Sequence, residues 1–203
     1  MELREALTQI AEIRRGVARA EVFQGYRAVP IAFSGILAIV AASLQPLVVA
    51  NPSEDLARYL TYWVAVAVLS ICATALEMLW SLHVSPSSLE RQKTLVAVRE
   101  FLPCLGVGGL LMAVVVRWAP GGVWMLPGIW SMLFGLGIFA SQRFLPRAVI
   151  VAALYYIGAG VVCLAAAQGE NALAPWAMGL PFGVGQLLCA AVLWRWEAQH
   201  EQE

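Results

Sequence analysis

Four polar residues of one apolar segment share a face of the helix expected there, and their side chains could do chemistry inside a membrane. These residues, spaced i, i+4, i+7 and i+11, are Ser70, Thr74, Glu77 and Ser81. An ionised side chain at the centre of a bilayer costs about 2.5–3.5 kcal/mol, so this face is expected to turn toward the interior of a helix bundle. The pattern is typical of a proton-responsive or ligand-binding group, and Ser34, Tyr155 or Tyr156 could reach it by depth.

Glu77 also has a simpler interpretation. It precedes Trp80 by three residues, which is about 4.5 Å along a helix axis. Its carboxylate could therefore reach the lipid headgroups, or pair with a cytoplasmic arginine such as Arg143 or Arg147. The sequence leaves both interpretations open.

Other catalytic and metal-binding patterns are missing from the sequence. The two histidines, His83 and His200, lie outside the apolar segments and cannot face each other as haem ligands. Each cysteine stands alone in an apolar segment, where a free thiol behaves as a small hydrophobic group; the four are Cys72, Cys104, Cys163 and Cys189. There is no phosphate-binding loop or nucleophile elbow. We therefore expect no catalytic residue, no metal, no cofactor and no enzymatic activity.

The composition indicates which elements must position the polar stripe. Of the 203 residues 61% are hydrophobic and only 13% are charged, with a net charge of zero, which excludes a soluble enzyme and a basic nucleic-acid binder. Six segments are long and apolar enough to be transmembrane helices. They are residues 29–50, 59–80, 101–118, 123–140, 148–168 and 173–194. The sequence thus predicts an all-α membrane protein, a six-helix transmembrane bundle over residues 28–195 in contact with a lipid bilayer.

The distribution of basic residues predicts the orientation of the bundle. Eleven Lys and Arg residues fall on the side of the two termini, and only Arg58 and Arg117 on the other. Tryptophans near the ends of the predicted spans agree with this depth assignment. We therefore expect a multi-pass protein of a bacterial inner membrane with both termini in the cytoplasm, including a tail at residues 196–203.

Residues 1–27 are predicted to form a cytoplasmic amphipathic helix. Apolar residues recur every seven positions in two series, which are Leu3, Ile10 and Val17, and Ala6, Ile13 and Ala20. The basic residues mostly lie off this stripe, and they are Arg4, Arg14, Arg15 and Arg19. The helix could lie on anionic lipid, or it could dock a partner or a second copy. A second cytoplasmic helix is expected after Pro86, because Ser87 and Glu90 have the spacing of a capping box.

Glycines are frequent in the predicted spans, including a G-x-x-x-G pattern at Gly179 and Gly183. Such small residues let helices approach closely, within one subunit by default or across a dimer. Residues 106–115 and 183–192 also agree at seven of ten positions, which would fit an inverted repeat. The sequence does not decide between these alternatives.

Four short segments carry a resemblance to a known family. They are Ile13-Arg14-Arg15, Phe33-Ser34-Gly35-Ile36-Leu37, Leu126-Pro127-Gly128-Ile129-Trp130 and Gly183-Val184-Gly185. In these the chain resembles a family of small six-span bacterial membrane proteins without established biochemical function, often encoded beside a winged-helix regulator. The resemblance implies this architecture and a regulatory setting, and it assigns no catalytic or binding residue.

Two functions follow as expectations. The first is a non-enzymatic membrane sensor or scaffold that binds a cytoplasmic protein partner through residues 1–25 and the loop after the second span, without direct contact to nucleic acid. The second is a small transporter or channel that acts as a homo-oligomer, with Glu77 lining the path.

Overall fold

The computed structural model describes residues 28–84, 88–142 and 145–200. The predicted amphipathic helix over residues 1–27, with its four arginines, lies outside the described residues, as does the end of the tail. Within the described ranges the chain forms six long α-helices, joined in part by short 3₁₀ helices. The long helices are α2 (Ala28–Val48), α3 (Leu56–Val84), α4 (Ser88–Trp118), α5 (Leu126–Ser141), α6 (Ile150–Ala166) and α7 (Pro175–His200).

Six helical stretches are apolar and long enough to cross a membrane, which confirms the predicted fold class. Four of them lie within α2, α3, α4 and α7, and the other two each consist of a short 3₁₀ helix that continues into α5 or α6. The expected helix after Pro86 is also present: α4 begins at Ser88 and continues through Pro103 to Trp118 without interruption. The fourth span differs from its prediction, because a 3₁₀ helix over Pro120–Met125 precedes α5. Its Pro120-Gly121-Gly122 start suits a tight turn better than a regular α-helix.

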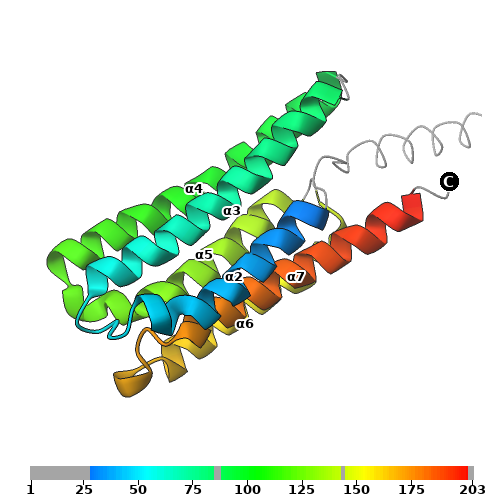
Figure 1. The fold of residues 1–203 in the computed structure, drawn as a ribbon. Coiled ribbons are helices and arrows are strands. Elements are labelled where there is room, and N and C mark those ends of the chain that lie inside the picture. The colour runs from blue at the N-terminus through cyan, green and yellow to red at the C-terminus, as the bar shows by residue number, and fades with distance from the viewer. Residues whose placement is uncertain (1–27, 85–87, 143–144, 201–203) are drawn as a thin grey trace, which may run out of the picture.

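Four helices form a tightly packed core. α2 lies along α7 and α5 along α6, while α6 and α7 join the two pairs. α4 packs on α5, and α3 meets α2. Only 6% of the apolar window of α3 and of α4 is buried, against 33% to 50% in the other four spans. The molecule therefore has a dense four-helix core and two peripheral helices (Figure 1).

Glycines hold the core helices together. A Cβ on Gly183 would meet Ile39 Cγ1 at 2.5 Å, and one on Gly179 would collide with the Cβ of Ala42, so this G-x-x-x-G pattern packs against α2 of the same chain. Gly128 and Gly160 make the equivalent close contact between α5 and α6. Close approach of this kind provides the dispersion contacts that drive helix association in lipid.

Candidate functional site

The polar stripe on α3 lies on the half-buried face of that helix. Ser70, Thr74 and Glu77 are all partly buried, whereas Ile71, Cys72 and Leu76 on the other faces are exposed. The hydroxyl of Ser70 donates to the carbonyl of Val66 and that of Thr74 to the carbonyl of Ser70, each at 3.0 Å. Both hydroxyls are therefore hydrogen-bonded to backbone carbonyls of their own helix, as serine and threonine hydroxyls commonly are in apolar helices. The backbone of Ser81 belongs to α3, and its side chain lies outside what the structure describes.

Tyr155 and Tyr156 lie in the four-helix core, since α6 packs on α5 and α7 whereas α3 packs on α2. The hydroxyl of Tyr155 donates to the carbonyl of Leu180 on α7 at 2.9 Å. Tyr156 is fully buried, with 0% exposure. The described contacts of both tyrosines are thus with the core, and none of them joins the stripe on α3.

Aromatic rings fill the centre of the core near Tyr156. Phe134 lies 4.8 Å from the Tyr156 ring and 4.9 Å from that of Phe101, centroid to centroid. Phe182 of α7 lies 5.8 Å from both Phe134 and Tyr156. These edge-on and tilted arrangements are favourable for aromatic pairs. The rings pack the space between α4, α5, α6 and α7.

Gln45 is hydrogen-bonded to two other segments at the end of the core where α2 ends and α7 begins. We call this arrangement of Gln45, Trp63 and Leu173 the clasp. The amide of Gln45, which is 1% exposed, donates from Nε2 to the carbonyl of Leu173 at 2.9 Å. Its Oε1 accepts a hydrogen bond of 3.0 Å from the indole Nε1 of Trp63. The clasp therefore ties α2 to α3 and to the α6–α7 connection, where Leu173 has a positive φ of 60°. Sequence reasoning missed this clasp, although a glutamine inside an apolar span was the available signal.

The buried thiol of Cys163 on α6 contacts the backbone of α7. Pro181 lies inside α7 and has no N–H, so the carbonyl of Ala177, four residues earlier, loses its helical partner. The Sγ of Cys163 approaches this carbonyl at 3.4 Å. The thiol therefore donates to a carbonyl that Pro181 leaves without its usual helical partner.

A shallow depression of about 360 Å³ lies at the α2–α3 connection, and it is lined by Val49, Ala50, Asn51, Glu54, Asp55 and Arg58. Polar side chains that line this depression are hydrogen-bonded to the backbone or to one another. The carboxylate of Asp55 accepts from the N–H of Arg58 at 3.0 Å, and the amide of Asn51 donates to Glu54 at 3.0 Å. These are the contacts of a helix N-cap and its turn. In the described parts of the chain no three His, Cys, Asp or Glu side chains come together.

No family model, curated protein or solved structure matches the chain. The physical character of the six long helices therefore decides its class. The chain is a multi-pass helical membrane protein. Its exposed surface agrees with this class, because large apolar side chains such as Leu76, Leu110 and Leu154 are each more than half exposed and would face lipid.

Proposed function

We propose that this protein is a non-enzymatic sensor or scaffold of the bacterial inner membrane that binds a cytoplasmic protein partner. The observation that carries the proposal is the length of α3 and α4. α4 has 31 residues, about 46 Å, whereas the hydrocarbon core of a bilayer is about 30 Å thick. Residues 88–98 of α4 precede its apolar span, which begins at Arg99, and residues 81–84 of α3 follow the corresponding span.

These two segments, 81–84 and 88–98, form what we call the helical arm. It extends beyond the core at the end where α2 begins and α7 ends (Figure 1). Its sequence changes from apolar to charged, with Glu90, Arg91 and Lys93. A polar helical extension beside a membrane suits contact with a soluble protein, and its charges would favour a partner of complementary potential.

The proposed orientation places the helical arm in the cytoplasm. Arg99, Arg147 and Arg195 belong to the same end of the bundle as the arm, and Arg58 and Arg117 belong to the opposite end. This asymmetry supports a cytoplasmic arm and cytoplasmic termini. The resemblance to a family often encoded beside a winged-helix regulator supports a regulatory setting.

Removal of the cytoplasmic charges is expected to weaken partner binding. The test compares recovery of co-purifying proteins from cross-linked cells by the full chain, by a variant lacking residues 2–24, and by Arg91→Gln/Lys93→Gln. We expect each variant to lose the specific partner by about tenfold, equivalent to about 1.4 kcal/mol of binding free energy. The matched control is Arg58→Gln/Arg117→Gln, which removes two charges at the other end and should retain the partner. Equal recovery by all four proteins contradicts the proposal.

The half-buried stripe of Ser70, Thr74 and Glu77 favours a second candidate function, a small transporter or channel that acts as a homo-oligomer. In this alternative, Glu77 lines the path, and a second copy covers the weakly buried α3 and α4.

For this second candidate, Glu77→Gln is expected to abolish proton flux, because glutamine keeps the shape of the side chain and cannot carry the proton. The protein is reconstituted into liposomes that contain a pH-sensitive dye. A potassium diffusion potential drives proton movement across the membrane, and the dye reports the flux. Flux should fall to the level of empty liposomes for Glu77→Gln and remain at the wild-type level for Glu54→Gln in the exposed α2–α3 connection. Unchanged flux in Glu77→Gln removes this residue from any transport path.

A further inference from the structure

The hydroxyl of Tyr156 is a buried polar group in the core that neither proposed function uses. Its residue lies at the middle of the apolar span Arg147–Ala166 and is 0% exposed. The ring is held by Phe134 and Phe182, and the backbone carbonyl accepts a hydrogen bond of 2.7 Å from Ser131. The position of the hydroxyl is therefore fixed by its surroundings.

This hydroxyl has no hydrogen-bond partner among the described residues. A buried polar group without a partner costs about 1–3 kcal/mol, and such a group calls for a partner such as a bound water. Phenylalanine would fill the same space without this cost. Gly185 of α7 faces the ring, since a Cβ there would collide with the Cζ of Tyr156.

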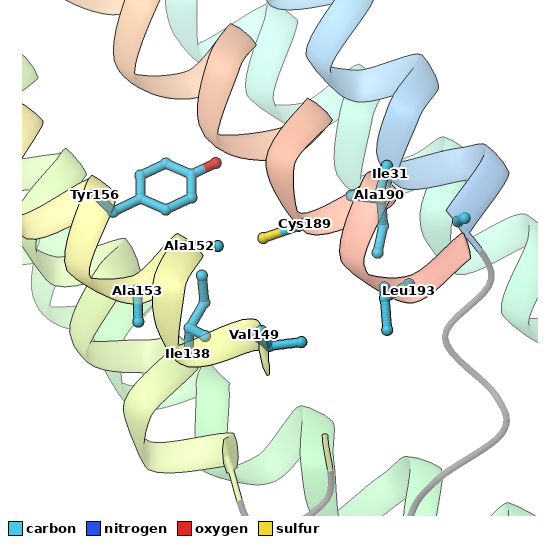
Figure 2. Close-up of a cluster of buried hydrophobic side chains, with 10 residues drawn as sticks. Ile31, Ile138, Val149, Ala152, Ala153, Tyr156, Cys189, Ala190 and Leu193 are labelled. Carbon is cyan, nitrogen blue, oxygen red and sulfur yellow. The ribbon is translucent and has the colours of Figure 1, made fainter. Parts of the chain in front are cut away.

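A second polar group lies one helical turn after Gly185. Cys189 is 6% exposed, and its side chain belongs to the same buried cluster as Tyr156. Figure 2 shows the tyrosine side chain extending from α6 toward α7 and the thiol extending from α7 toward α6. A thiol is both a weak donor and a weak acceptor, so it can complete the coordination of a small polar molecule held by the hydroxyl.

We propose that one water molecule is bound between the Tyr156 hydroxyl and the Cys189 thiol and bridges α6 and α7 at the middle of the membrane. A water molecule can donate and accept at once, and these two side chains would supply two of its usual two to four partners. The bridge adds a further polar contact between α6 and α7 to the hydrogen bond that Tyr155 donates to Leu180. It does not depend on either proposed function.

The test is infrared difference spectroscopy of the detergent-solubilised full chain in H₂¹⁶O and H₂¹⁸O. The wild type should show an ¹⁸O-sensitive O–H band of a buried water, and Tyr156→Phe should lose it. Tyr155→Phe is the matched control, because its hydroxyl already donates to Leu180 and its removal should leave the band unchanged. Cys189→Ala should shift the same band and remove one S–H stretch. A wild type without the band, or a band unchanged in Tyr156→Phe, overturns the proposal.

Thermal unfolding provides a second readout for the same variant. If the hydroxyl were truly unpartnered, Tyr156→Phe would remove its desolvation cost and raise the unfolding midpoint. If it binds water, the midpoint stays constant or falls, because the water loses a partner. A rise in the midpoint therefore overturns the proposal independently of the spectra.

Discussion

Gly160→Val is expected to destabilise the protein by about 3 kcal/mol, at the upper end of the usual cost of overpacking. A Cβ at this position would lie 2.5 Å from Met132 Cγ and 2.6 Å from the backbone carbonyl of Gly128. The methionine side chain can move, but the carbonyl belongs to α5 and can retreat only if the two helices separate. The free energy of unfolding in mixed micelles, followed by circular dichroism, measures the loss.

Gly158→Val is the matched control for this prediction. Gly158 lies two residues earlier on the same helix, and a Cβ there would meet nothing within 4 Å. Both substitutions change helix propensity by the same amount, so the difference between them reports the α5–α6 contact alone. Equal destabilisation by the two variants would show that helix propensity, and not close packing, is the reason for glycine at position 160.

Close contacts between helices also illustrate what the sequence could and could not predict about the fold. Runs of apolar residues predicted the six spans, because length and hydropathy are local properties. The glycines Gly179 and Gly183 indicated a face suited to close packing. They did not indicate their partners, because contacts between helices far apart in the chain leave no periodic signal in either segment. The pairing of α2 with α7, the first and last spans, could only come from the structure.

The same limit applies to the candidate site. Ser70 and Thr74 stood out because polar residues are rare in apolar spans, yet their hydroxyls bond to their own helix. Tyr155 matched the stripe in depth, but depth along the membrane normal does not determine which helices are neighbours. Gln45 carried the same kind of signal as Glu77, a polar side chain in an apolar span, and it forms the buried clasp.

Gln45→Met is expected to destabilise the protein by about 2–6 kcal/mol. Methionine keeps the approximate length of the side chain, so the main change is the loss of both hydrogen bonds. The indole N–H of Trp63 and the carbonyl of Leu173 then remain buried without these partners, and each unsatisfied group costs about 1–3 kcal/mol. The free energy of unfolding and the fluorescence of Trp63 should both change, because this indole is only 2% exposed.

Gln168→Met is the control, since that amide is exposed in the connection after α6 and donates to the nearby carbonyl of Leu164. Its effect should stay within about 0.5 kcal/mol, as for most surface substitutions.

A double-mutant cycle with Trp63→Phe separates the clasp from general packing. Phenylalanine has no indole N–H. In the Trp63→Phe background, the loss of Gln45 therefore leaves no buried indole donor without a partner. The two substitutions should therefore cost less together than the sum of their separate effects, by about 1–3 kcal/mol. Additive effects would contradict the clasp, because two residues joined by a buried hydrogen bond cannot act independently on the stability of α2 and α3.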